Sequence, residues 1–171
     1  MKYSKVSFQQ FYKDLPFGGK VDEVTARRWY ENIKLPKQGT ASSMGTDFFM
    51  PYSVTINPRA KIKIPTGIKW ECSEEFRGFF GLLIVPRSSM GRKGLRLLNT
   101  IAVIDGDYSD AENEGHIILF MENTSDEAIQ IPAGKGFAQG IVTGYTICDG
   151  AEADDDTKRS GGFGSTDKKG E

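Results

Sequence analysis

The sequence is poor in the residues that build metal centres and disulfides. Its 171 residues include two cysteines and one histidine, and Cys72 and Cys148 lie far apart with no Cys-x-x-Cys pair. This usage favours two buried thiols in a reducing compartment over a zinc site or a disulfide. Neither sign of charge is in excess, because the formal net charge is −1. The charge therefore predicts no general attraction to nucleic acid or to a membrane.

Long apolar runs are missing as well. No stretch approaches the roughly 20 apolar residues that a membrane-spanning helix needs. The N-terminus, Met-Lys-Tyr-Ser-Lys, is not followed by the apolar segment of a secretory signal. The hydrophobic fraction of 38% and the charged fraction of 26% are ordinary for a globular protein. We therefore expect a soluble, cytoplasmic protein with one main domain.

The chain divides into three segments. Residues 1–36 predict a helical N-terminal extension, because Ser7 with Gln10 matches a capping box and apolar residues recur at helical spacing. Residues 37–148 predict a mainly β core, a jelly-roll-like barrel or sandwich, because short β-branched stretches alternate with Pro and Gly breaks. Residues 149–171 are acidic and then glycine-rich, which is typical of a flexible tail.

The predicted strands of the core are short and closely spaced. The run 79–85 is continuously apolar, so we expect a strand buried on both faces, and we expect His116 to be a strand residue with a satisfied ring nitrogen. The full set of predicted strands is 53–57, 61–65, 67–70, 79–85, 95–98, 100–104, 116–121, 128–131 and 140–145.

Two motifs in the core could carry phosphate chemistry. Pro86-Arg87-Ser88-Ser89 offers a guanidinium and two hydroxyls, which can hold phosphate oxygens. Asp105-Gly106-Asp107-Tyr108 follows a second apolar run, and Asp105 could activate a water for attack on the ligand that Arg87 holds. Each motif also has an ordinary interpretation, because Asp-Gly is common in turns and an arginine can cap a surface turn.

The tail contains a third candidate motif, Gly-Gly-Phe-Gly-Ser-Thr at residues 161–166. Two interpretations remain open. It is either a disordered terminus, or a segment that folds over a nucleotide, stacks Phe163 on a base and offers backbone N–H groups to phosphates.

Taken in order, these motifs resemble those of the homotrimeric dUTPase family (dUTP nucleotidohydrolases). Residues 40–47 resemble the first motif, 86–89 the second, Asn99 with 103–108 the third, 132–139 the fourth and 161–166 the fifth. Five motifs in this order over about 130 residues are far more specific than any one alone. The resemblance implies the family's β fold and a homotrimer with active sites between subunits.

The resemblance also implies the chemistry, which is hydrolysis of dUTP to dUMP and pyrophosphate. This reaction keeps uracil out of DNA and supplies dUMP. Asp105 would activate the water that attacks the α-phosphorus, and Asp47 would support that site. Mg²⁺ would be held mainly by the triphosphate and waters, so no cluster of protein ligands is expected.

The remaining site residues follow from the same resemblance. Tyr108 would pack flat on the deoxyribose and leave no space for a 2′-hydroxyl. The residues expected at the phosphates are Arg87, Ser88, Ser89, Gln139, Arg159, Lys158, Ser165 and Thr166. Those expected at the uracil and the deoxyribose are Asn99, Val103, Ile104, Tyr108, Ile118 and Phe163.

The sequence departs from the family pattern at several places. Lys135 and Gly136 stand where an acid and an arginine are common, and Thr46 replaces an aromatic residue. The loop 109–116 is longer than usual, and the helical residues 1–36 replace the strand that normally opens the family. In the fifth motif either Arg159 or Lys158 could reach the γ-phosphate.

Three other functions remain as alternatives. A dCTP deaminase, or its bifunctional relative, shares the fold and an Arg-Ser-Ser turn but lacks the Asp-x-Asp-Tyr pattern. A nucleotide-dependent protein-binding module could hold a protein partner through the N-terminal helices and the long loop. A structural β-barrel without a ligand is the third alternative.

Overall fold

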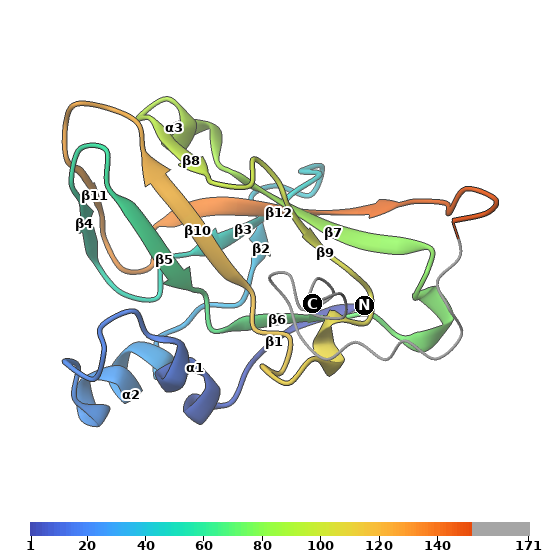
Figure 1. Ribbon diagram of the computed structural model, residues 1–171, viewed down its shortest axis with the longest axis horizontal. Coiled ribbons are helices and arrows are strands. Elements are labelled where there is room, and N and C mark those ends of the chain that lie inside the picture. The colour runs from blue at the N-terminus through green and yellow to red at the C-terminus, as the bar shows by residue number, and fades with distance from the viewer. Residues whose placement is uncertain (152–171) are drawn as a thin grey trace, which may run out of the picture.

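Residues 1–151 are described by the computed structural model, and in them short strands form four antiparallel sheets (Figure 1). The strands are β1 (Lys2–Lys5), β2 (Lys37–Gln38), β3 (Thr46–Phe49), β4 (Val54–Ile56), β5 (Lys61–Pro65), β6 (Ile68–Glu71), β7 (Phe80–Pro86), β8 (Leu95–Leu97), β9 (Ala102–Ile104), β10 (Ile118–Asn123), β11 (Ile129–Ile131) and β12 (Gly136–Gly144). The helices are α1 (Phe8–Asp14), α2 (Glu23–Glu31) and α3 (Ser88–Gly91), with 3-10 turns η1 (Glu74–Phe76) and η2 (Tyr108–Asp110).

The largest sheet has five strands in the order β2-β3-β12-β7-β9. The other sheets pair β1 with β6, β4 with β11, and β10 with both β5 and β8. The mainly β fold is therefore confirmed. Within the described residues the sheets do not close into a barrel, so that part of the prediction is wrong. β4, β8, β9 and β11 have three residues each, and such short ladders end before they can continue around a barrel.

The nine predicted strands all appear, as β4 to β12, with ends that differ by a few residues. The sequence prediction missed β1, β2 and β3. β2 has only two residues, and β3 lies inside the first motif, where glycines and hydroxyl residues precede it. β1 and β3 form by pairing with β6 and β12, which are distant in the sequence, and local patterns do not reveal such pairing. β2 pairs in turn with the edge of β3.

The N-terminal segment contains the helices α1 and α2. The Ser7 Oγ accepts the Gln10 N–H at 3.1 Å to begin α1, and the Asp22 carboxylate accepts the Thr25 N–H at 2.9 Å to begin α2. However, β1 precedes them and pairs antiparallel with β6, from Lys2 opposite Glu71 to Lys5 opposite Ile68. The prediction that helices replace an opening strand is therefore wrong, because the edge of β6 accepts these residues as a strand.

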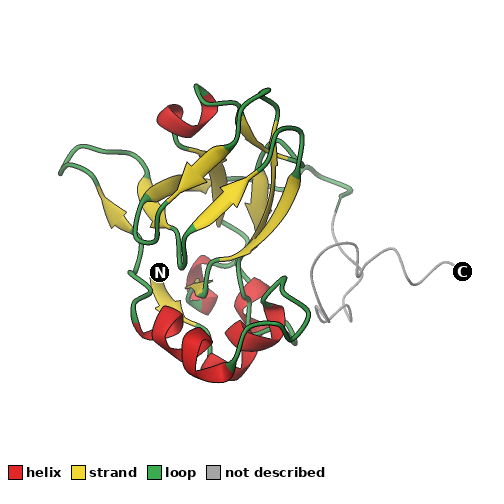
Figure 2. Cartoon of the chain, turned by 90° about the vertical axis from the view of Figure 1, so that its left-hand side faces the viewer, coloured by secondary structure: helices red, strands yellow, loops and turns green. Residues whose placement is uncertain are grey.

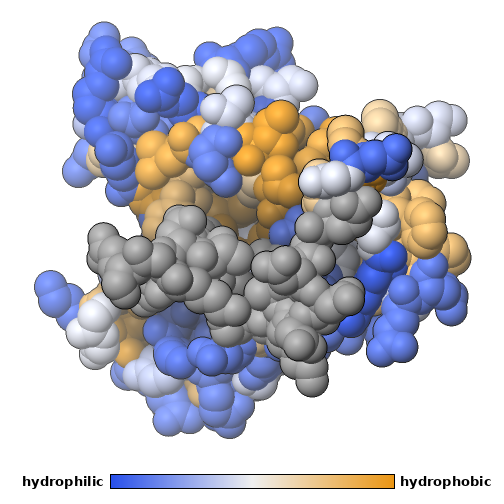
Figure 3. All heavy atoms as spheres, turned by 45° about the vertical axis from the view of Figure 1, so that its right-hand side comes forward, coloured by the Kyte–Doolittle hydropathy of each residue, from blue (hydrophilic) through white to orange (hydrophobic). Residues whose placement is uncertain are grey.

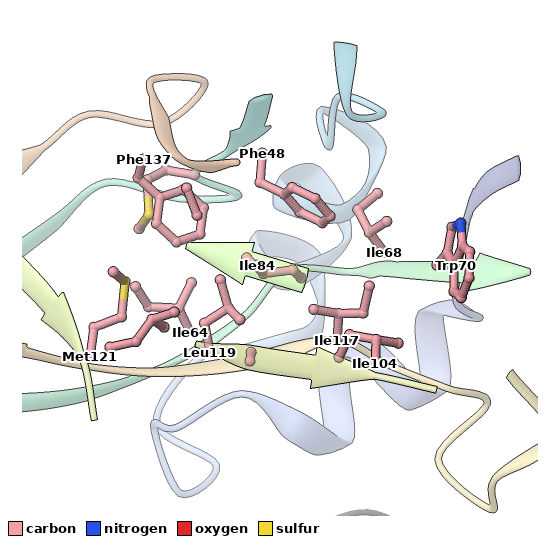
Figure 4. Packing of buried hydrophobic residues seen from close by; sticks show 14 of the residues in the cluster. Phe48, Ile64, Ile68, Trp70, Ile84, Ile104, Ile117, Leu119, Met121 and Phe137 are labelled. Carbon is pink, nitrogen blue, oxygen red and sulfur yellow. The ribbon is translucent and has the colours of Figure 1, made fainter. Parts of the chain in front are cut away.

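The helices α1 and α2 lie at one end of the molecule and pack against the sheets (Figure 2). The Phe17 and Trp29 rings contact Tyr52, with centroids 5.4 Å and 4.8 Å from its ring. Phe11, at 0% exposure, joins the same buried cluster as the strands. Figure 4 shows the centre of this cluster, where side chains from β3, β5, β6, β7, β9, β10 and β12 meet. None of the helices among residues 1–151 is long and apolar enough to cross a membrane.

Four side chains differ from the sequence prediction. In a single chain, β7 is fully buried on one face only, because Leu83 and Val85 on its other face are half-exposed. His116 lies in a turn before β10 rather than in a strand, although it is fully buried and its ring is hydrogen-bonded. Cys72 is a buried free thiol as expected, whereas Cys148 is exposed after the end of β12, where no element covers it.

Candidate active site

The outer face of the five-stranded sheet brings together residues from three of the motifs. Asp47 on β3 pairs with Gln139 on β12, and Gln139 pairs with Val85 on β7. Because side chains alternate along a strand, these residues share the face opposite to the buried Phe48 and Ile84. Antiparallel pairing thus places a carboxylate and an amide in adjacent positions, although the sequence separates them widely.

Arg87 reaches the same place from the end of β7. Its N–H donates to the Phe137 carbonyl at 3.1 Å, which extends the pairing between β7 and β12 by one residue. The Arg87 Nε lies 3.1 Å from the Asp47 Oδ1, and the two side chains are 37% and 18% exposed. The guanidinium is therefore oriented by Asp47 and remains accessible to a ligand.

Two glycines leave room for this cluster. A Cβ on Gly136 would lie 2.5 Å from the Arg87 Nη1, and a Cβ on Gly45 would lie 3.0 Å from the Gln139 Oε1. A side chain at Gly136 would displace the Arg87 guanidinium. Gly136 stands where the family commonly has an arginine, and its lack of a side chain leaves the space that the Arg87 guanidinium occupies.

Ser88 and Ser89 follow Arg87 in the single turn α3. The N–H groups of Met90 and Gly91 donate to the Arg87 carbonyl at 2.8 and 3.0 Å, and the buried Met90 side chain anchors the turn. Ser88 is exposed and Ser89 is half-buried. The turn therefore keeps both serines directly beside the Arg87–Asp47 pair.

Asp105 lies in a different region, directly after β9. A turn joins β8 to β9, but the two strands belong to different sheets, because β8 pairs with β10 and β9 pairs with β7. Residues 95–105, with this turn, are called the Asp105 hairpin below. The hairpin turn is tight, because Thr100 has a φ of 64° and the Ile101 N–H donates to the Asn99 carbonyl at 2.6 Å. Asn99 and Asp105 are exposed, and Val103 is 62% exposed. These residues can meet a ligand that approaches the hairpin.

The other residues expected at the base and sugar are covered in the single chain. Ile104 and Ile118 are each 8% exposed and Tyr108 is 5% exposed. The Tyr108 hydroxyl donates to the His116 carbonyl at 3.1 Å and accepts from the Asn113 amide at 2.9 Å. Two hydrogen bonds at the hydroxyl thus hold the Tyr108 ring in place.

The two regions lie at opposite ends of β7. Leu82 pairs with Ile104, so Gly81 is the β7 residue nearest to Asp105, whereas Arg87 follows the other end. Six residues of extended chain separate these points by about 20 Å. One chain therefore does not bring Asp105 and Arg87 to the same phosphate group.

An apolar depression of about 700 Å³ lies at the Asp105 end of β7. Among residues 1–151, none of the predicted site residues lines it; its described walls are Glu75, Phe76, Phe79, Phe80, Gly144, Tyr145 and Thr146.

Arg77 packs against the segment that follows Asp105, which the sequence did not indicate. It donates to the Asp110 carboxylate with both Nη1 and Nη2, and a Cβ on Gly106 would lie 3.3 Å from its backbone. The hydrogen bond from Arg77 lowers the pKa of the Asp110 carboxyl. Arg77 and Asp110 are 33 positions apart, so no local pattern could have paired them.

Five predicted site residues, Lys158, Arg159, Phe163, Ser165 and Thr166, lie outside the described residues. Within residues 1–151, no three His, Cys, Asp or Glu side chains gather closely enough to hold a metal ion.

Comparisons with known proteins agree with one another. The sequence model of the dUTPase family matches residues 31–167. The deoxyuridine 5′-triphosphate nucleotidohydrolase of Lactococcus lactis is 36% identical over 148 residues, which cover 84% of this chain and 95% of that protein. The crystal structure of a dUTPase from Streptococcus mutans superposes with a TM-score of 0.64 at 31% identity, covering 88% of this chain and 100% of that one. A dUTPase of Staphylococcus bacteriophage 80alpha, solved with dUPNHPP, shares the fold with a TM-score of 0.58 at 20% identity, covering 79% and 92% of the two chains.

Proposed function

The chain belongs to the dUTPase family and hydrolyses dUTP to dUMP and pyrophosphate, and we propose that its active sites form between the subunits of a homotrimer. The observation that carries this proposal is the separation of Arg87 and Asp105 at opposite ends of β7. In-line attack on a phosphate needs the water-activating group and the phosphate-holding groups within hydrogen-bond reach of one phosphoryl centre. A second chain meets this requirement if its Asp105 hairpin lies over the Arg87–Asp47 cluster of the first.

The surface between the two regions supports subunit contact. Val103, Leu83 and Ile141 are paired side by side across β9, β7 and β12, on the face away from the core. Leu83 and Ile141 are half-exposed, and Val103 is exposed. Figure 3 shows a broad apolar area on the face of the molecule that is turned toward the viewer. An apolar row flanked by polar site residues is a typical feature of a subunit interface.

Asp105 is the general base in this proposal. Its carboxylate takes a proton from the attacking water as oxygen bonds to the α-phosphorus, and pyrophosphate leaves. Arg87, Ser88 and Ser89 of another subunit stabilise the negative charge that develops on the leaving group. Gln139 adds an amide donor from the neighbouring strand, and Asp47 keeps the guanidinium oriented.

The substrate is the Mg²⁺ complex of dUTP. Mg²⁺ prefers oxygen ligands and commonly keeps several waters, and the triphosphate supplies such oxygens. The bound ion neutralises phosphate charge. The chain's own task is to orient this complex between Arg87 and Asp105.

The hairpin selects the base and the sugar. Asn99 and the backbone around Val103 hydrogen-bond the uracil edge, in a pocket that leaves no space for a 5-methyl group. Tyr108 packs against the deoxyribose and rejects a 2′-hydroxyl by contact. The two hydrogen bonds of the Tyr108 hydroxyl support this role, because a ring held in place cannot move aside for a larger sugar.

Subunit mixing tests the shared site. Asp105→Asn and Arg87→Ala chains are each inactive as homotrimers. When equal amounts are unfolded together and refolded, about one quarter of the sites combine an intact Asp105 with an intact Arg87, if trimers assemble at random. We expect about that fraction of wild-type pyrophosphate release. No recovery in mixed trimers would contradict the shared site.

Substrate comparison tests the activity itself. Pyrophosphate release is measured with dUTP, dTTP, dCTP and UTP, and only dUTP is expected to react rapidly. Ammonia release from dCTP would instead support the deaminase alternative. Tight dUTP binding without pyrophosphate release would support the nucleotide-dependent binding module.

A further inference from the structure

The long loop that follows the Asp105 motif is attached to the N-terminal helix α1. The Glu114 carboxylate accepts two hydrogen bonds from Ser7, one from its N–H at 2.7 Å and one from its Oγ at 2.6 Å. Glu114 has a φ of 58°, in the left-handed region that residues other than glycine rarely adopt. Its contact with Ser7 offsets the strain of this conformation and fixes the loop at that point.

This contact completes the cap of α1. In a capping box, the side chain three residues after the cap reaches back to the cap N–H. Gln10 occupies that position, but its side chain donates to Asp14 at 2.7 Å. Glu114, 107 positions away, accepts the Ser7 N–H instead. The start of α1 and the loop therefore form one hydrogen-bonded unit.

The other end of α1 holds the loop at a second point. The His116 Nε2 accepts the Gly67 N–H at 2.8 Å, so its ring proton is on Nδ1, which donates to the Asp14 Oδ2 at 2.6 Å. His116 is 0% exposed. A buried hydrogen bond to a carboxylate is strong and strongly oriented, so the position of α1 sets the position of the His116 backbone.

Tyr108 depends on that backbone. Its hydroxyl donates to the His116 carbonyl at 3.1 Å, and its N–H donates to the Asp105 carbonyl at 3.1 Å. A Cβ on Gly115 would lie 2.7 Å from the Tyr108 carbonyl, so the loop also packs directly against the Tyr108 backbone. A continuous series of contacts thus leads from α1 to the residues of the Asp105 motif.

We propose that Ser7 and Asp14 are positioning residues for the segment 105–108, acting through Glu114 and His116. The proposal rests on the proposed function, because it assigns α1 a part in the selection of deoxyribose by Tyr108. A misplacement of about 1 Å at a reacting or binding group can cost roughly 100-fold in rate. Loss of one anchor is therefore expected to appear in sugar selectivity and not only in stability.

The test uses the full chain with a matched control for helix capping. Ser7→Ala removes the hydroxyl that contacts Glu114 and caps α1. Asp22→Ala removes the equivalent cap of α2, whose side-chain hydrogen bonds go to Thr25. Glu112→Gln changes an exposed carboxylate in the same loop. Ser7→Thr keeps the hydroxyl and serves as the conservative rescue.

Two quantities are measured for each variant, the ratio of kcat/KM for dUTP to that for UTP, and the melting temperature. We expect Ser7→Ala to lower the ratio about tenfold, with Ser7→Thr within about twofold of wild type. We expect Asp22→Ala to lower the melting temperature and leave the ratio unchanged, and Glu112→Gln to change neither. If Ser7→Ala does not fold, Glu114→Ala replaces it with the same expected fall, because it removes both acceptors of the Ser7 contact and leaves the Ser7–Gln10 cap intact.

Equal ratios in Ser7→Ala and Asp22→Ala would overturn the proposal. Amide hydrogen exchange gives a readout that does not need activity. Exchange at residues 108–117 should accelerate in Ser7→Ala and stay at the wild-type rate in Asp22→Ala. A wild-type chain without pyrophosphate release would refute the proposed function, whereas wild-type activity with unchanged exchange in Ser7→Ala would refute only the positioning role.

Discussion

The Arg87 cluster and the Asp105 segment are built in different ways. In the Arg87 cluster, side chains from β3, β12 and the end of β7 lie beside one another, and Arg87 pairs with Asp47. In the Asp105 segment, position depends on backbone turns and on a loop attached to α1. The first region is set by strand register and the second by a connection between distant segments.

The difference has an energetic side. Partly exposed ion pairs contribute only about 0–1 kcal/mol, so the Arg87 guanidinium can shift toward a bound phosphate at low cost while Asp47 stays beside it. Displacement of the Tyr108 segment would instead break several hydrogen bonds in a region where His116 is fully buried. In the proposed site, the Arg87 cluster can therefore adjust to the phosphates, whereas the Tyr108 segment imposes its shape on the sugar.

The largest expected effect is that of Asp105→Asn. An amide cannot take the proton of the attacking water, so kcat should fall by at least about 1000-fold. The dissociation constant of a non-hydrolysable dUTP analogue, measured by calorimetry, should change little, because the shape of the hairpin is kept. Loss of binding together with turnover would show that Asp105 belongs to the architecture of the hairpin and not to its chemistry.

Deletion of residues 158–171 comes next. It removes Phe163 and both candidate cations of the fifth motif, and we expect kcat/KM for dUTP to fall about 100-fold. The melting temperature should stay within a few degrees of the full-length value, because the described residues already form a large buried cluster of their own. A collapsed melting temperature would show that the tail is needed for the fold.

Arg87→Lys tests how far the phosphate region depends on a fork-shaped donor. Lysine keeps the charge but loses the planar geometry that pairs with phosphate oxygens, so we expect KM to rise about tenfold with a smaller change in kcat. Steady-state kinetics give both constants. An unchanged KM would show that charge alone suffices in this region.

The smallest expected effect is on stability in acid, and it concerns the loop contact. Burial raises the pKa of the Glu114 carboxyl, but the hydrogen bonds from Ser7 and the charge of Lys69 outweigh burial and lower the pKa overall. A lowered pKa stabilises the fold above the ordinary glutamate value of about 4.3, and this stabilisation is lost as pH falls through the folded-state value.

Glu114→Gln should remove that contribution. Melting temperatures measured from about pH 6 to about pH 3 should fall less steeply in this variant than in the wild type. Asp14 remains as a second acid-sensitive group. Although burial raises the pKa of its carboxyl, the hydrogen bonds from His116 and Gln10 and the charge of Lys63 lower it overall. Parallel curves for wild type and variant would mean that the Ser7 contact contributes nothing to acid stability.

Much of the fold could be predicted from local patterns. Alternation, Pro and Gly breaks and helix caps located the strands from β4 to β12 and both N-terminal helices. The pairing partners could not be predicted, because register depends on contacts between segments far apart in sequence. β1 illustrates this, since Lys-Tyr-Ser-Lys has no strand signature of its own and becomes a strand only against β6.

The candidate site shows the same limit. The motifs identified Asp47, Arg87, Gln139 and Asp105 as residues of interest, and strand pairing explains why the first three meet. The separation of Asp105 from Arg87 depends on the register of β7 with β9, which no motif encodes. The Ser7–Glu114 contact was hidden for a related reason, because its two residues are 107 positions apart and glutamate gives no sign of a left-handed backbone.

The length of β7 between its two functional ends has a consequence for dilution. A lone subunit carries both sets of groups yet brings no single phosphate within reach of both. Specific activity should therefore vanish on dilution below the concentration at which subunits separate, even where each remains folded. In the proposed trimer, catalysis therefore depends on the concentration of the protein as much as on its sequence.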